Sequence, residues 1–177
     1  MIIRAIKMED APDFYGLRTM DGVRENILGM VSERPDATEN FIRALSANDH
    51  VLVAELDGVV VGCVNLHISQ KPRERHTGGL GLMVHSGYQG RGIGRALMEA
   101  ILDVADNWLM LKRVELSVFT DNRPAVRLYE SMGFVVEGTK KYAAVRNGRY
   151  ADEYMMARYG NALSSGVTAN DAESPKE

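Results

Sequence analysis

Residues 89–94, Gln-Gly-Arg-Gly-Ile-Gly, are the stretch of the chain whose residue types could bind an anion. An apolar run at 80–84 precedes them and an amphipathic segment at 95–109 follows, which predicts a strand, a glycine turn and a helix. Glycines accept backbone angles that a Cβ forbids, and they let a ligand approach the main chain. The helix start offers unpaired N–H groups and the positive end of the helix dipole. Because Arg91 and Arg95 add positive charge, we expect a phosphate or pyrophosphate here.

The glycine spacing excludes two common phosphate motifs. It is not the Gly-x-Gly-x-x-Gly of dinucleotide-binding folds, and no Asp or Glu ends a second strand as those folds require. It is not a P-loop, because no Gly-Lys-Ser/Thr follows. The plain alternative is a helix N-terminus with permissive glycines and no ligand.

Length and composition predict one soluble domain. The chain has 177 residues, 45% of them apolar and 25% charged, with a net charge of −3. This charge gives nucleic acid no general attraction, and it suits a cationic acceptor such as an amine. We expect no membrane span and no secretory signal, and therefore a cytoplasmic protein. The single cysteine, Cys63, excludes an internal disulfide and is expected to be buried, and the four histidines show no metal-ligand spacing.

Hydrophobic periodicity and turn residues predict the elements that position the glycine turn. The expected strands are 2–7, 51–56, 59–68, 80–84, 113–119 and 134–137, with tight hairpin turns at Asp57-Gly58 and Asn147-Gly148. A first helix is expected to start at 9–12, and a second near Asp36 with Phe41, Ile42 and Leu45 inward. A third is expected over 95–109 with Trp108 in the core, and a fourth from Asn122 to Gly133. The loop at 21–32 is either a plain connection or a wall of an acceptor pocket. Residues 160–177 are expected to form a polar tail after a domain at 1–159.

Three stretches together resemble the GCN5-related N-acetyltransferase (GNAT) superfamily. They are 82–84 with the Gln-x-x-Gly-x-Gly turn, 115–119 with Asp121-Asn122, and 125–134, which reads Ala-Val-Arg-Leu-Tyr-Glu-Ser-Met-Gly-Phe. Residues 106–109 and the ending at 141–158 look like the bacterial YhhY-type acetyltransferases, a subgroup associated with N-acetylation of L-amino acids.

The resemblance implies an α+β fold of three layers. Its mostly antiparallel mixed sheet would have about seven strands flanked by four helices, and strands four and five would splay apart to admit the pantetheine of acetyl-CoA. The freed backbone near Met83 and Val84 would pair with the pantetheine, the amides from Arg91 to Ala96 would bind the pyrophosphate, and Asn122 would bind from the opposite side. The complete set of implied cofactor-binding residues is Leu82, Met83, Val84, Gln89, Gly90, Arg91, Gly92, Ile93, Gly94, Arg95, Ala96, Asn122, Ala125 and Tyr129.

Tyr129 is implied as the catalytic general acid that protonates the leaving thiolate, and its phenol pKa of about 10 lies near that of a thiol. The alternative is a packing aromatic, and the alternative for Asn122 is a helix cap. Many relatives carry a basic carboxylate where this chain has Gly79. The base therefore stays unassigned, and the candidates are His67, His76, His85 and Glu115.

The sequence favours an acetyl-CoA-dependent N-acetyltransferase that uses no metal and acts on a small-molecule amine, with an L-amino acid first. Two alternatives stay open: a protein N-terminal or antibiotic acetyltransferase, and an acyl-CoA sensor without catalysis. The oligomeric state is also open, with a homodimer as one option.

Overall fold

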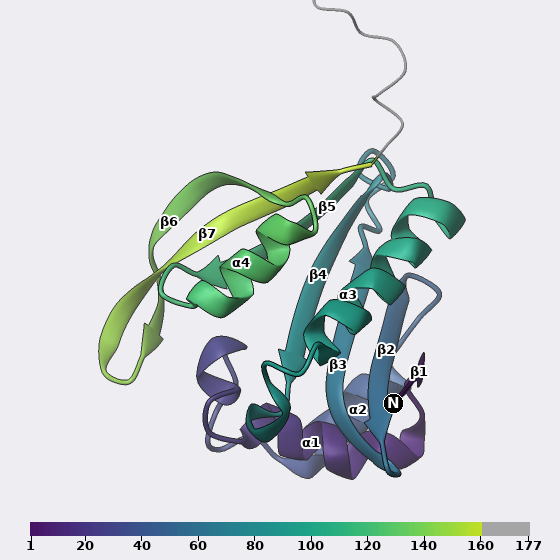
Figure 1. The fold of residues 1–177 in the computed structure, drawn as a ribbon, viewed down its shortest axis with the longest axis vertical. Coiled ribbons are helices and arrows are strands. Elements are labelled where there is room, and N and C mark those ends of the chain that lie inside the picture. The colour runs from purple at the N-terminus through teal and green to yellow at the C-terminus, as the bar shows by residue number, and fades with distance from the viewer. Residues whose placement is uncertain (161–177) are drawn as a thin grey trace, which may run out of the picture.

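A seven-stranded sheet forms the centre of the chain in the computed structural model, which describes residues 1–160 (Figure 1). The tail expected beyond the domain lies, apart from Gly160, outside the described residues. The sheet order is β1-β2-β3-β4-β5-β7-β6, with only β4 and β5 paired in parallel. The strands are β1 Ile2–Ala5, β2 Asp49–Leu56, β3 Val59–Ile68, β4 Thr77–Val84, β5 Arg113–Phe119, β6 Val135–Arg146 and β7 Arg149–Tyr159.

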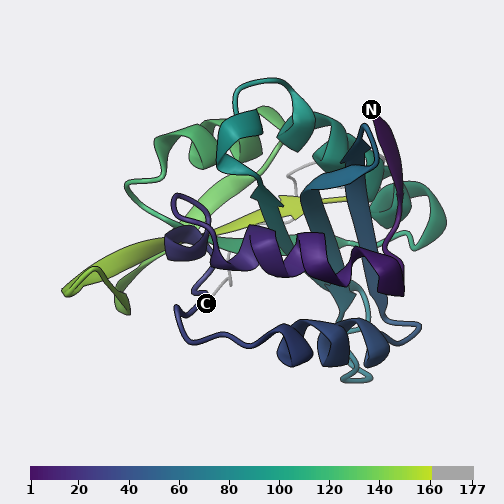
Figure 2. The same cartoon turned by 90° about the horizontal axis from the view of Figure 1, so that it is seen from below.

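Helices cover both faces of the sheet, so that the described residues form three layers (Figure 2). The helices are α1 Ala11–Thr19, α2 Pro35–Arg43, α3 Ile93–Asp103 and α4 Arg123–Ser131. Helices α1 and α2 lie on one face, and α3 and α4 lie on the other. The expected fold class, with about seven strands and four helices, is confirmed.

The core has two parts, one on each face of the sheet. The larger part lies between the sheet and helices α3 and α4, and it includes the fully buried Leu97, Met98 and Ile101. The smaller part lies under α1 and contains Cys63, which is buried as expected. Burial raises the pKa of this thiol well above its ordinary value, because the thiolate would lose its hydration.

Trp108 is not a core residue, and this corrects the sequence-based expectation. Its side chain is 79% exposed. After α3 the chain makes a π-helical turn, Val104–Trp108, in which the N–H of Leu109 donates to the C=O of Val104 at 3.0 Å. This wider turn shifts the buried face by one residue, so that Ala105 is fully buried and the indole points outward. A strict period of 3.6 cannot anticipate such a shift.

Helix α2 presents a narrower apolar face than expected. Ile42 is buried and Leu45 is half-buried, but Phe41 is 41% exposed. The Phe41 ring stacks on that of Phe14 with 5.6 Å between centroids, so it packs on α1 at the protein surface.

Two hairpin turns occur where the sequence predicts them. Asp57 and Gly58 have φ of 52° and 82° between β2 and β3, and Asn147 and Gly148 have φ of 51° and 74° between β6 and β7. Positive φ at both central residues is the geometry of the tight turn that Asp-Gly and Asn-Gly favour. The second turn sets the pairing at the tip of the long β6–β7 hairpin, and two irregularities shift the register farther along. The hairpin projects beyond the rest of the sheet (Figure 2), and Arg146 near its tip still contacts Asp121 after β5.

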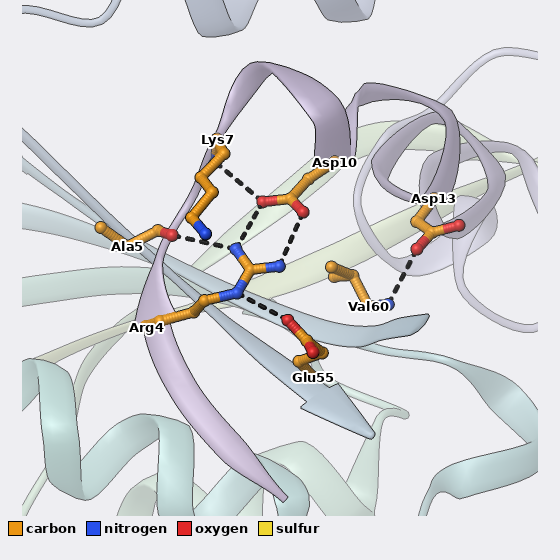
Figure 3. Close-up of polar contacts among 7 residues, drawn as sticks. All are labelled: Arg4, Ala5, Lys7, Asp10, Asp13, Glu55 and Val60. Carbon is orange, nitrogen blue, oxygen red and sulfur yellow. Dashed lines mark hydrogen bonds and ion pairs between the residues drawn. The ribbon is translucent and has the colours of Figure 1, made fainter. Parts of the chain in front are cut away.

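An ion-pair cluster ties the start of α1 to the edge of the sheet (Figure 3). Both Nη atoms of Arg4 donate to the carboxylate of Asp10, at 2.7 and 2.8 Å, and its Nε donates to Glu55 at 2.7 Å. The backbone N–H of Lys7 also donates to Asp10, at 2.7 Å. The hydrogen bonds from Arg4 hold the pKa of the buried Asp10 carboxyl below its usual value. Asp10 is therefore explained as a structural anchor.

We expect Asp10→Asn to lower the free energy of unfolding at pH 7 by about 2–3 kcal/mol, because it removes charged hydrogen bonds and leaves Arg4 without its main partner. A carboxyl whose folded pKa is depressed contributes stability above its unfolded pKa of about 3.9. This contribution is lost as the pH falls through the folded pKa, so the gap between wild type and variant should shrink below about pH 4. Urea titrations at pH 7 and pH 3 measure it. Asp36→Asn, in an exposed pair with Arg34, should cost about 0.5 kcal/mol or less. A gap that does not change with pH would contradict the charge explanation.

Candidate functional site

The parallel strands β4 and β5 pair only at one end. Thr77, Gly78 and Gly79 face Arg113, Val114 and Glu115 in register. Beyond these residues β4 continues to Val84 and β5 to Phe119, with no further pairing between them (Figure 1). The sheet therefore opens at the carboxyl ends of β4 and β5, and the expected splay is confirmed. We call the space between the unpaired parts of the two strands the β4–β5 gap.

The alternation of β4 decides which of its backbone groups face the β4–β5 gap. The N–H of His85 donates to the C=O of Val61 at 2.9 Å, so His85 is directed toward β3. Residues two apart along a strand share this direction, and the C=O of Met83 accordingly lies against Gly62 of β3. The backbone groups of Leu82 and Val84 therefore face the gap. Of the two residues expected to pair with pantetheine, Val84 lies on this edge, whereas the backbone of Met83 belongs to the β3 side. Leu82, another of the expected cofactor-binding residues, also lies on this edge.

Gln89 ties the glycine turn to the end of β4. Its side-chain Nε2 donates to the C=O of Val84 at 3.1 Å. A backbone acceptor that the splay leaves free is thus partly satisfied by the first residue of the motif. Through this hydrogen bond, Gln89 holds the glycine turn next to the β4–β5 gap.

The glycine turn leads into α3 with its first N–H groups open. Gly92 precedes Ile93 with φ of 82°, and no side chain caps this helix start. A Cβ on Gly92 would meet no atom within 4 Å, so the backbone borders open space. The first turn carries no acidic side chain, and Arg91 and Arg95 are exposed beside it. The guanidinium of Arg91 lies 5.2 Å from the ring centre of Tyr88, and Arg95 donates to Ser131 at 3.0 Å. This arrangement favours an anion at the helix N-terminus.

Gly94 has a different role from Gly92. A Cβ on Gly94 would lie 3.3 Å from Leu128 of α4 and 3.6 Å from Leu82 of β4. The glycine therefore lets α3, α4 and β4 approach one another closely around the gap. Substitution of Gly94 would disturb this packing as well as a ligand, which makes Gly92 the cleaner position for a test.

Tyr129 is buried on α4 in the same cluster as Leu82, Val84 and Val118. It is 6% exposed, and its ring centre lies 5.9 Å from that of Phe134. Its hydroxyl forms no hydrogen bond with another residue among 1–160. Burial raises the pKa of Tyr129 to about 12, because the phenolate would lose its hydration. The group therefore stays protonated at neutral pH, when it can donate a proton but cannot serve as a base.

Asn122 acts as the N-cap of α4. Its Oδ1 accepts a hydrogen bond from the N–H of Ala125 at 3.3 Å. The cap interpretation is confirmed, and the Nδ2 of Asn122 makes no hydrogen bond with another described residue. Asn122 and Ala125 both stand at the N-terminus of the helix that carries Tyr129.

A sequence model of the Acetyltransferase (GNAT) family matches residues 11–134. The chain belongs to this family. The L-amino acid N-acetyltransferase AaaT of Escherichia coli is 47% identical over 107 residues, which are 60% of this chain and 66% of that protein. The N-alpha-acetyltransferase RimI of Mycobacterium tuberculosis is 36% identical over 72% of this chain and 78% of its own length. The chain thus spans just under two thirds of the E. coli relative and more than three quarters of the mycobacterial one.

A solved GNAT structure extends the likeness to nearly the whole described fold. The spermidine N-acetyltransferase of Vibrio cholerae, in complex with CoA and spermine, has a TM-score of 0.79 and 25% identity. The match covers 89% of this chain and 94% of that chain. The match is longer than that of the family model, which covers residues 11–134.

Three of the four base candidates make side-chain contacts in this GNAT chain. His67 Nδ1 lies 2.6 Å from Asp49, and Arg113 donates to Glu115 at 2.8 Å. His85 Nδ1 accepts from the N–H of Gly87 at 3.0 Å, which in the neutral ring places the proton on Nε2. His76 is exposed in the loop before β4. A Cβ at Gly79 would meet no atom within 4 Å, so a side chain would have room at this position. The carboxylate that many relatives carry there is missing from this chain.

A hollow between the β6–β7 hairpin and the loop after β5 was not anticipated from the sequence. Its volume is about 670 Å³, and it is lined among others by Thr120, Asp121, Tyr142, Arg146 and Tyr150. The Asn147-Gly148 turn predicts the hairpin, but no local signal shows that the hairpin folds back against the end of β5. The Nη1 of Arg146 also donates to the Oδ1 of Asn26 at 3.4 Å, so the hairpin contacts the loop at 21–32.

Two negative findings concern the described part of the chain. Every helix within residues 1–160 is too short or too polar to span a lipid bilayer. In the same residues, no three His, Cys, Asp or Glu side chains gather as metal ligands would.

Proposed function

We propose that this GNAT protein is an acetyl-CoA-dependent N-acetyltransferase that acts on the primary amine of a small molecule. The observation that carries the proposal is the β4–β5 gap, which leads from an uncapped, glycine-framed helix start past the buried Tyr129. An elongated ligand with an anionic group at one end fits this combination. Acetyl-CoA supplies the activated acyl group as a thioester.

The residues of the chain that would hold acetyl-CoA fall into three groups. The N–H groups from Arg91 to Ala96 would bind the pyrophosphate, with Arg91 and Arg95 adding charge. The backbone of Leu82 and Val84 would pair with the pantetheine, as a neighbouring strand would. Asn122 would use its free amide group from the α4 side. The cofactor would approach the main chain closely at Gly90, Gly92, Ile93 and Gly94. Indirect support for this part of the site would come from Met83, Gln89 and Ala125.

Tyr129 would donate its proton to the sulfur as the C–S bond of the thioester breaks. The acceptor amine forms the new C–N bond by direct attack on the thioester carbonyl. The amine nitrogen gives up one proton in forming the amide, and a proton returned to the phenolate restores Tyr129. The raised pKa suits this role, because the group is fully protonated at the start of each cycle.

An L-amino acid is the first choice for the acceptor. The E. coli relative is named as an L-amino acid N-acetyltransferase, and the residues that match it make up most of this chain. The missing carboxylate at Gly79 also favours an amine that is easier to deprotonate than lysine, whose pKa is about 10.4. The name of the mycobacterial relative supports a second candidate, acetylation of a protein N-terminus. We place the reaction in the cytoplasm, with no nucleic acid or membrane partner.

Two measurements test the proposal. Millimolar acetyl-CoA should raise the melting temperature, because a ligand that binds only the folded state stabilises it. Free CoA should then be released with a panel of the twenty L-amino acids, and more slowly with peptides that carry only internal lysines. No thermal shift would refute the cosubstrate, whereas a shift without CoA release for any amine would indicate an acyl-CoA sensor. Robust acetylation of peptide lysines with none of free amino acids would overturn the acceptor class.

A further inference from the structure

Among residues 1–160, none of the helices α1 to α4 covers one face of the β5–β7–β6 part of the sheet. On β5, Val114, Leu116 and Val118 pack in the core with α3 and α4, so Glu115, Ser117 and Phe119 face the other way. The register pairs Phe119 with Glu153 of β7, which places these two side chains on the same face. Helices α1 and α2 lie over this face only at β2, β3 and β4.

Phe119 stands at the level of the β4–β5 gap. In the paired part, Gly79 of β4 is opposite Glu115 of β5. Continuing the register by four residues brings Phe119 to the level of Met83, between the levels of Leu82 and Val84. Groups around Phe119 therefore lie beside the part of the gap where Leu82 and Val84 would pair with the pantetheine.

Arg146 brings a positive charge onto Phe119 from the β6–β7 hairpin. Its guanidinium lies 4.5 Å from the centre of the Phe119 ring, and its Nη2 pairs with Asp121. The side chain is 19% exposed and borders the hollow described above. A guanidinium has five N–H donors, and Arg146 uses one on Asp121 and one in a long contact to Asn26. Donors therefore remain for a carboxylate ligand.

Glu153 brings a negative charge to the same ring. It is 8% exposed, which makes it one of three buried polar or charged side chains among residues 1–160. The buried Asp10 is held by Arg4, but no described side chain forms a hydrogen bond or ion pair with the carboxylate of Glu153. Neither oxygen of this carboxylate is among the described side-chain atoms that are fully buried without a partner, so the carboxylate keeps contact with solvent. It is therefore accessible to a ligand and is not consumed by a contact within the fold.

We propose that Arg146 and Glu153 are the two poles of the acceptor site for a free amino acid, an inference that rests on the proposed function. Arg146 binds the α-carboxylate through paired N–H donors. Glu153 accepts a proton from the α-ammonium group and thereby supplies the base that Gly79 does not. The two charges match a zwitterion, and neither a lysine side chain nor a polyamine offers both.

The proton balance follows from these roles. The α-ammonium group transfers one proton to Glu153, which later releases it to solvent. The neutral amine forms the C–N bond as the C–S bond breaks, and Tyr129 protonates the sulfur. The nitrogen then loses its second proton, which restores Tyr129. The products are the N-acetyl amino acid, CoA with a free thiol, and one proton.

The carboxylate pole is tested with Arg146→Gln and two acceptors, the L-amino acid with the highest kcat/KM in the panel and its α-carboxamide. We expect KM for the acid to rise at least tenfold and KM for the amide to change less than threefold. Arg73→Gln removes the same charge from the exposed loop before β4, away from the hollow, and it should change either KM less than twofold. Equal effects on acid and amide, or an equal effect of Arg73→Gln, would overturn the assignment.

The base is tested with Glu153→Gln over pH 6.5–9.5. We expect kcat/KM to fall about 100-fold at pH 7. The deficit should shrink as the pH rises, because the acceptor amine then loses its proton without help. Glu153→Asp should keep part of the activity, and Glu130→Gln, an exposed change on α4, should have no effect. A deficit that is the same at every pH would show that Glu153 is structural.

One control separates this inference from the proposed function. Each variant must show the wild-type thermal shift with acetyl-CoA, which reports both folding and cosubstrate binding. If wild type acetylates amino acids but the variants show no acid-specific or pH-dependent defect, only the two poles are wrong. If wild type acetylates no amino acid, the acceptor class and the two poles fail together.

Discussion

Tyr129→Phe should lower both kcat and kcat/KM for N-acetyl transfer by roughly 10²- to 10⁴-fold. This corresponds to about 3–5 kcal/mol of transition-state stabilisation. The ring is retained and can still pack 5.9 Å from Phe134, so only the hydroxyl is lost. Acetyl-CoA affinity should change less than threefold, because the proton is needed only as charge develops on the sulfur. A water molecule that replaces the hydroxyl would bring the loss toward the lower end.

Single-turnover CoA release and the acetyl-CoA thermal shift together measure this prediction. Tyr154→Phe is a matched control, since Tyr154 of β7 packs against the same cluster and is half-buried. It should change kcat less than twofold. With a pKa of about 12, Tyr129 should also cause no loss of activity between pH 8 and pH 10, where an ordinary tyrosine begins to ionise. Wild-type kcat in Tyr129→Phe, with chemistry rate-limiting, would make Tyr129 a packing residue.

Gly92→Val should raise the Kd of acetyl-CoA by at least 10- to 100-fold, which is about 1.4–2.8 kcal/mol. The Cβ branch would project into the open space in front of the first N–H groups of α3, where the pyrophosphate is proposed to lie. The substitution also strains the backbone, because φ at Gly92 is +82°. This strain should cost about 1–3 kcal/mol of folding stability.

Gly58→Val separates the two effects. Gly58 has the same φ of +82° and likewise no atom within 4 Å of an added Cβ, but it lies in the β2–β3 turn. Both variants should lose similar amounts of stability in urea titrations. Only Gly92→Val should lose acetyl-CoA affinity by isothermal titration calorimetry. Equal acetyl-CoA affinity in the two variants would show that the glycine turn is structural and holds no ligand.

The sequence alone predicted features that depend on a few neighbouring residues. The Asp57-Gly58 and Asn147-Gly148 turns, the Asn122 cap and the strand–turn–helix around Gly92 all form as expected. Each depends on the φ preference of a glycine or on one short side-chain hydrogen bond, so the local residues are sufficient. The family resemblance added the mixed sheet of about seven strands, the four helices and the splay between β4 and β5.

Only the tertiary structure decided which distant groups meet at the site. β7 lies between β5 and β6, and its register with β5 places Glu153 beside Phe119. The fold-back of the hairpin then brings Arg146 onto the same ring. The π-helical turn likewise places Trp108 outside the buried helix face that its spacing in the sequence predicts. Strand order, register and helix phase are set by the packing of the whole core, because many alternative pairings satisfy the same local pattern.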